Sequence, residues 1–161
     1  MAVDPHTNKS LRVRIKNIKS GRYLSIEGDQ NNWNNDDASL TINDWLGIDV
    51  LSSPQVWTIL QYRANSYILI NQFSGYLASI RGRSKDNGAT VTQYHCQLPI
   101  SEPFQQWTFK KLENGNYLIQ NVNSSKYIGP HNRDTGNGTY CIQWDDQTGE
   151  DSYQEWVFEE I

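Results

Sequence analysis

Short stretches of alternating apolar and polar residues run through the chain, separated by clusters of Gly, Asn, Asp and Ser. Residues 11–16, for example, alternate Leu, Val and Ile with Arg and Lys, which is typical of a strand with one buried face. The clusters favour turns, because Gly frees φ and Asn, Asp and Ser hydrogen-bond locally. No stretch keeps the 3.6-residue period of a helix. The pattern therefore predicts an all-β protein.

The tripeptide Q-x-W occurs three times, and its tryptophans lie 50 and 49 residues apart, at Trp57, Trp107 and Trp156. Two further landmarks recur at this period. One is an alternating strand that ends in an asparagine and precedes a Ser- or Gly-containing turn, with the asparagines at Asn17, Asn71 and Asn121. The other is a short strand midway to the next Q-x-W motif. Together they define a tail and three repeats, at residues 1–10, 11–62, 63–112 and 113–161.

One such repeat, with about four short strands, cannot close a hydrophobic core by itself. Three copies around a pseudo-threefold axis can close a barrel, which also removes exposed strand edges. We therefore predict a single β-trefoil domain over residues 11–161, with a three-bladed propeller as the structural alternative. The motif tryptophans are predicted to belong to the core, where a buried indole N–H usually has a hydrogen-bond acceptor.

Composition and charge narrow the possible functions. The net charge of −4 argues against a nucleic-acid binder, which usually needs a basic face. No apolar run approaches the roughly 18 residues of a membrane span. The first ten residues contain no hydrophobic signal segment, so we expect a cytoplasmic protein or one released without a classical signal. The two cysteines, Cys96 and Cys141, are expected to be free thiols.

The sequence contains no motif for a metal, a cofactor or an enzymatic nucleophile. Its three histidines have no partner at the spacing of a zinc site. No phosphate-binding loop, dinucleotide fingerprint or nucleophile elbow is present. We therefore expect a protein without a cofactor and without enzymatic activity.

Three Q-x-W motifs in a chain of this size resemble the ricin B-type lectins, and the resemblance covers residues 11–161. Members of that family are β-trefoils that bind sugars, often galactose or N-acetylgalactosamine, with up to one site per repeat. Each family site uses an Asp after the first hairpin, an aromatic residue about 15 positions later that stacks on the sugar ring, and an Asn before the motif Gln. The resemblance implies a lectin with shallow glycan sites.

The third repeat matches this spacing best. Gly129 takes the position of the family Asp, and Trp144 lies 15 residues further along the chain. The neighbouring loops supply polar groups that could replace the missing carboxylate: His131, Asn132, Asp145 and Gln147. We therefore expect the third repeat to be the first-ranked sugar site.

The second repeat is ranked next. Ala78 takes the Asp position, Ser79 follows it, and Tyr94 lies 16 residues beyond Ala78. His95 follows the tyrosine, and Arg81 lies in the facing loop. An arginine in this site would suit an acidic sugar, because a guanidinium pairs well with a carboxylate.

The first repeat is ranked last because an insertion changes its spacing. Ser25 is followed 18 residues later by Asn43, and Trp45 lies two residues beyond that. Asp44 stands between them, and we include Ser25, Asp44 and Trp45 as the candidate site.

The departures from the family keep other functions open. The family Asp is absent from every repeat, and its Asn is replaced by Pro54, Phe104 and Tyr153. A β-trefoil protease inhibitor, or another protein-binding trefoil with vestigial sugar sites, is the main alternative, and a carbohydrate-binding module of a larger hydrolase or toxin is another. The leading hypothesis is a lectin for the glycans of glycoproteins or glycolipids, similar to stored defence lectins of fungi. Shallow sites gain from multivalency, so we also expect a homodimer.

Overall fold

Six strands close a β-barrel in the computed structural model, which describes residues 1–96, 102–147 and 152–161. In order around the barrel they are β2 (Ser10–Asn17), β5 (Trp57–Arg63), β6 (Ser66–Asn71), β9 (Trp107–Lys111), β10 (Tyr117–Asn121) and β13 (Trp156–Glu160). Each strand pairs antiparallel with the next, and β13 returns to β2. The barrel therefore has no free edge, which protects it from pairing with another chain.

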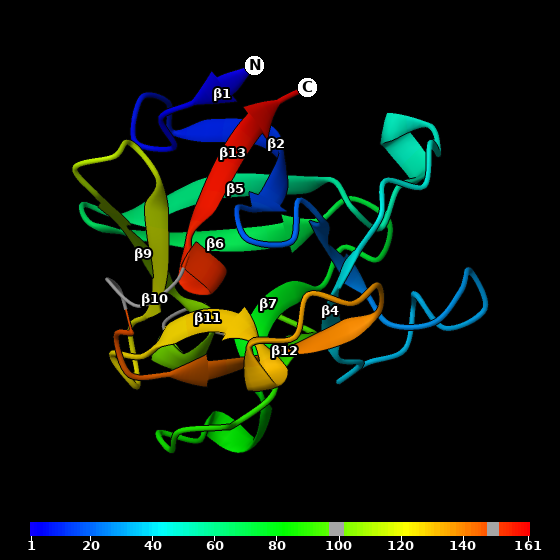
Figure 1. Ribbon diagram of the computed structural model, residues 1–161. Helices are drawn as coiled ribbons and strands as arrows, with labels where there is room; N and C mark the ends of the chain where they lie inside the picture. The colour runs from blue at the N-terminus through cyan, green and yellow to red at the C-terminus, as the bar shows by residue number, and fades with distance from the viewer. Residues whose placement is uncertain (97–101, 148–151) are drawn as a thin grey trace.

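Three hairpins form a cap over one end of the barrel, in the lower half of Figure 1. They consist of β3 (Tyr23–Ile26) with β4 (Leu40–Asn43), β7 (Leu77–Ile80) with β8 (Val91–Tyr94), and β11 (Tyr127–Pro130) with β12 (Thr139–Trp144). Pairing of β12 with β4 and two single bridges join the hairpins to one another. Each repeat thus gives two barrel strands and one cap hairpin. The predicted β-trefoil is confirmed, and the propeller alternative is wrong because the strands close one barrel.

The three motif tryptophans are fully buried where barrel and cap meet. Each indole N–H donates a hydrogen bond, at 3.0–3.1 Å, to a carbonyl oxygen in the first cap strand of its own repeat: Trp57 to Leu24, Trp107 to Ala78 and Trp156 to Ile128. The prediction that these tryptophans are core residues is therefore confirmed.

The three repeated asparagines, which are also buried, tie each repeat to the one before it. Their side-chain N–H groups donate to the residue that precedes the motif glutamine of the neighbouring repeat: Asn71 to Pro54 (2.8 Å), Asn121 to Phe104 (3.0 Å) and Asn17 to Tyr153 (2.8 Å). Their side-chain oxygens accept from backbone N–H groups of the following turn. The ring of contacts closes because Asn17 reaches the third repeat.

The first ten residues, which the repeats leave out, contact the barrel. Strand β1 (Ala2–Val3) pairs with β13, which brings the two termini side by side in Figure 1. The His6 ring then packs against the rings of both Tyr67 and Phe109, with centroids 5.8 and 6.0 Å away. Burial raises the pKa of the neighbouring Tyr117 to about 12.

Both cysteines are free thiols. Cys141 lies in the core, where burial raises the pKa of its thiol and keeps it in the less reactive protonated form. Among the described residues, no helix has the length and apolar character needed to cross a membrane.

Candidate glycan-binding pockets of the cap

The pairing of the cap strands fixes which residues are equivalent in the three repeats. Ser25, Ser79 and Gly129 pair with the same position of the second cap strand. The assignment of Ala78 to the family Asp position is therefore wrong by one residue, since the Ala78 carbonyl instead accepts the Trp107 indole N–H. The repeated tyrosines cause the error, because Tyr76 stands one residue earlier in its hairpin than its apparent counterparts.

The same pairing identifies the residue that stands in the stacking position of each repeat. Tyr94 pairs with Leu77, and Trp144 pairs with Tyr127. In the first repeat this position belongs to Asn43. The second and third repeats therefore have an aromatic ring at this position and the first does not.

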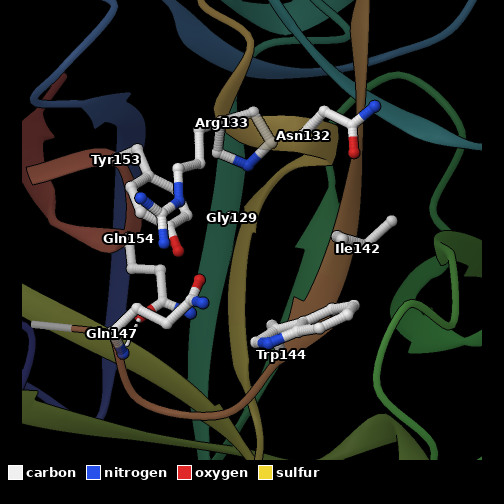
Figure 2. Close-up of a pocket in the computed structure, with 9 residues that line it drawn as sticks. Gly129, Asn132, Arg133, Ile142, Trp144, Gln147, Tyr153 and Gln154 are labelled. Carbon is white, nitrogen blue, oxygen red and sulfur yellow. Dashed lines mark hydrogen bonds between the residues drawn. The ribbon is translucent and has the colours of Figure 1, made fainter. Parts of the chain in front are cut away.

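The third repeat carries a pocket of about 150 Å³ between β11, the end of β12 and the turn before β13. It contains four of the predicted residues, namely Gly129, Asn132, Trp144 and Gln147. The Trp144 ring stands across the pocket from Tyr153 and Arg133 (Figure 2). Its side chain is 38% exposed, which leaves an apolar face open to a ligand. Sequence reasoning missed the remaining lining residues: Pro130, Arg133, Ile142, Tyr153 and Gln154.

Two residues predicted for the third site are not among those that line its pocket. His131 stacks on Tyr140, with ring centroids 4.5 Å apart. Asp145 accepts hydrogen bonds from the Asn87 side chain and the Lys126 ammonium, each at 2.9 Å, and these bonds lower the pKa of its carboxyl. No carboxylate lines this pocket among the residues that the structure describes. Asp145 is therefore not a replacement for the missing family Asp.

The motif glutamine holds the loop after the stacking residue. Gln154 donates to the Asp145 carbonyl (3.0 Å) and accepts from the Gln147 backbone N–H (2.8 Å), the bond drawn in Figure 2. It also limits what can stand at position 129. A Cβ added to Gly129 would lie 3.1 Å from the Gln154 Cγ, closer than ordinary van der Waals contact. An Asp at position 129 would therefore require a shift of Gln154.

The second repeat carries a pocket of about 190 Å³. Of the predicted residues, Arg81 and Tyr94 line it, together with Asp37, Ile80, Gly82, Arg83, Thr92 and Phe104. Ser79 and His95 are not among the lining residues. The buried Ser79 hydroxyl donates to the Leu77 carbonyl (2.9 Å), and the His95 Nδ1 lies 2.6 Å from a carboxylate oxygen of Asp36. Both side chains therefore make contacts within the cap and do not line the pocket.

The first repeat carries the most voluminous of these cap pockets, about 410 Å³, along the long loop after β3. Ser25 lines it as predicted, beside Asp29, Asn31, Trp33 and Asn43. Asp44 and Trp45 are not among the lining residues. Asp44 pairs with the Arg22 guanidinium at 3.1 Å, and Trp45 packs under the Arg14 guanidinium at 4.7 Å. Asp44 and Trp45 therefore interact with arginine side chains and do not line this pocket.

No group of three or more His, Cys, Asp or Glu side chains stands at metal-binding distance within residues 1–96, 102–147 and 152–161.

Comparison with known proteins gives one family and many structures of the same fold. A family model described as "Ricin-type beta-trefoil lectin domain-like" matches residues 3–94 and 103–161. The designed threefold-symmetric protein ThreeFoil has a TM-score of 0.81 and 24% identity over 93% of this chain and 99% of its own. The Macrolepiota procera ricin B-like lectin, solved in complex with lactose, has a TM-score of 0.73 and 18% identity over 93% and 95%.

An enzyme also contains this fold as one part. The exo-β-1,3-galactanase 1,3Gal43A from Clostridium thermocellum has a TM-score of 0.77 and 23% identity over 94% of this chain. The chain spans only 30% of that enzyme's length. A search of curated proteins returns no match. At these identities the structural likenesses establish the fold alone.

Proposed function

Because the chain belongs to the ricin-type β-trefoil lectin domain-like family, we propose that it is a non-enzymatic lectin that binds glycans in the pockets of its cap. The observation that carries the proposal is the third-repeat pocket, which is lined by the exposed Trp144 ring and by the amide side chains of Asn132 and Gln147. A sugar offers an apolar C–H face and a hydroxyl edge. An exposed indole and amide groups complement these two surfaces.

Galactose or N-acetylgalactosamine is the sugar class that we propose for this pocket. The support is the family and the stacking residue at the family's spacing. With no described carboxylate lining the pocket, hydrogen bonds to the sugar come from amides and from the Arg133 guanidinium. The second-repeat pocket has Tyr94 in place of Trp144, and its polar lining consists of two arginines, Asp37 and Thr92.

Several pockets on one cap make the protein multivalent. Multivalency can raise avidity by about 10²–10⁴ over a single weak site without new contacts. We propose that the protein uses this avidity on the glycans of glycoproteins or glycolipids. Its assembly as a homodimer, its location in the cytoplasm and its use in defence stay predictions.

A glycan array with the tagged full-length protein tests the proposed function. We expect binding to a coherent set of glycans with terminal galactose or N-acetylgalactosamine. A coherent set of other sugars would retain the lectin and reject the galactose class. A blank array, from protein whose near-ultraviolet circular dichroism shows a packed fold, would contradict the proposal and favour the protease-inhibitor alternative.

A further inference from the structure

The second and third repeats contain the same arginine-on-aromatic arrangement at equivalent positions. Arg83 and Arg133 each follow the first cap strand of their repeat by three residues and line its pocket. The Arg83 guanidinium carbon lies 5.1 Å from the Phe104 ring centroid, and that of Arg133 lies 5.0 Å from the Tyr153 ring centroid. These rings occupy the position directly before each motif glutamine. The repeats have thus replaced the family Asn by an aromatic shelf for a cation.

The backbone at both arginines has an unusual conformation that the two repeats share. Arg83 and Arg133 have φ of +56° and +58°, in the left-handed region that residues other than glycine rarely adopt. In the second repeat the preceding residue is Gly82, but in the third it is Asn132, also at positive φ. Such conformations persist where the surroundings enforce them, and they gather at ligand sites. The turn directs each arginine onto its ring in the same way.

A guanidinium stacked on a ring contacts the ring through its flat face, while its N–H donors lie at its edge, in the plane of the fork. Neighbouring carboxylates use only part of this capacity in the second pocket. Arg83 has Glu102 at 3.7 Å, longer than a hydrogen bond, and Arg81 binds Asp37 through its Nε at 3.2 Å. Planar donors of this kind recognise carboxylate and sulfate oxygens better than neutral hydroxyls.

A second, independent observation marks the second pocket as a ligand site. Thr92 lines this pocket and is 1% exposed, yet its hydroxyl makes no hydrogen bond within the part of the chain that the structure describes. Buried polar groups nearly always have a partner, so an orphan hydroxyl on a pocket wall indicates a group that enters from outside. The equivalent residue of the third pocket is Ile142.

The first repeat has the opposite charge at the same places. Counting along the cap strand from Ser25, Glu27 stands where the second repeat has Arg81, and Asp29 stands where it has Arg83. Pro54 takes the place of the aromatic shelf. One molecule thus contains two pockets lined by arginine and one whose described lining has a carboxylate and no arginine.

We propose that the pockets of the second and third repeats bind saccharides that carry an anionic group, a carboxylate or a sulfate, and that Arg83 and Arg133 determine this specificity. The proposal rests on the proposed function and names its ligand class. In the third pocket, a sugar ring stacked on Trp144 would direct its far edge toward Arg133, since Figure 2 shows the two side chains on opposite sides. The first repeat is excluded from this specificity by Asp29.

Isothermal titration of the full chain with three matched sugars tests the proposal. Galactose, galacturonic acid and galactose 6-sulfate differ only at C6. We expect the better of the two acidic sugars to bind about tenfold more tightly than galactose, the gain typical of a charge-assisted hydrogen bond. A preference for either acidic sugar supports the proposal, and the titration shows whether the pockets favour a carboxylate or a sulfate. Added salt should weaken the acidic sugar but not galactose.

Substitutions then assign the effect to the arginines. The double variant Arg83→Gln/Arg133→Gln should bring the ratio of acidic to neutral affinity down to about one, and Arg83→Lys/Arg133→Lys, which keeps the charge, should retain part of the acidic preference. Lys110→Gln removes one exposed cation of β9 and should change nothing. Should the double variant fold poorly, the wild-type ratio of acidic to neutral affinity still decides.

Equal affinity for galactose and both acidic sugars would overturn the proposal and leave the lectin intact. An acidic preference that survives in the double variant would also overturn it. Absence of binding to all three sugars and to the glycan array would reject both the acidic specificity and the proposed function.

Discussion

The motif tryptophans and the cap pockets occupy equivalent places in the three repeats, yet only the tryptophans are kept constant. Each indole makes the same hydrogen bond at 3.0–3.1 Å. The pockets, in contrast, differ in volume, about 150, 190 and 410 Å³, and in charge. All three tryptophans belong to one core that the repeats share, so a change in one copy disturbs the packing of the others. An exposed pocket side chain such as Trp144 ends in solvent and can vary alone.

Hydrogen bonds between the cap hairpins lie between the core and the pockets, and in these bonds the first repeat differs from the other two. Gln93 donates to the carbonyls of Trp33 and Asn35, at 2.9 and 2.8 Å, in the loop of the preceding repeat. Gln143 does the same for the second-repeat loop. The equivalent residue in the first repeat is Ile42, and the Arg22 guanidinium instead reaches the Thr135 carbonyl. The three repeats thus differ in the hydrogen bonds that join the cap hairpins as well as in their pockets.

Removing a motif tryptophan should have the largest effect. Trp107→Ala should destabilise the protein by about 3–5 kcal/mol, because it leaves a cavity in the core and an unpaired Ala78 carbonyl. Chemical denaturation followed by fluorescence measures the change. Trp144→Ala removes the same side chain from a half-exposed site and is the matched control. Equal losses in the free energy of unfolding would show that a motif tryptophan contributes no more to stability than a pocket tryptophan.

Removing a ring-closing asparagine should have the next largest effect. Asn121→Ala deletes the buried bond to the Phe104 carbonyl and the acceptor for the turn at Ser124. We expect a loss of about 1–3 kcal/mol in the free energy of unfolding, since buried polar groups are left without partners. Asn65→Ala, at an exposed turn, should stay within about 0.5 kcal/mol. A loss at Asn121 no larger than that of the control would show that the repeats are not held through this ring.

The fold could be predicted from the sequence because the residues that make its structural contacts recur in each repeat. Glycine and serine turns, the terminal asparagines and the Q-x-W motifs recur at one period, and each marks a contact made three times. The single register error, at Ala78, arose where a repeated tyrosine fell on a different position of its hairpin. Strand pairing corrects it, and pairing is not visible in one strand alone.

The site could be predicted only along the cap strands. The spacing correctly placed Trp144 and Tyr94 in pockets. It also predicted Asp145 as a site residue, but Asp145 is hydrogen-bonded to Asn87 of the neighbouring repeat and does not line the pocket. Contacts between repeats carry no local sequence signal. Arg133 was missed, and Tyr153 was interpreted only as a lost family asparagine. A signal was present, since an aromatic residue follows Arg83 by 21 residues, at Phe104, and Arg133 by 20 residues, at Tyr153.

The smallest expected effect separates the pocket from the surface around it. Trp144→Ala should weaken glycan binding by about 1 kcal/mol, about fivefold in affinity, because the sugar loses its stacking partner. Tyr140 lies on the same strand, is equally exposed at 38% and stacks on His131 outside the pocket, so Tyr140→Ala is the matched control. Titration with the sugar that the array selects should show a loss for Trp144→Ala only. Unchanged affinity in that variant would move the principal site to the second repeat, where Tyr94→Ala should then show the loss.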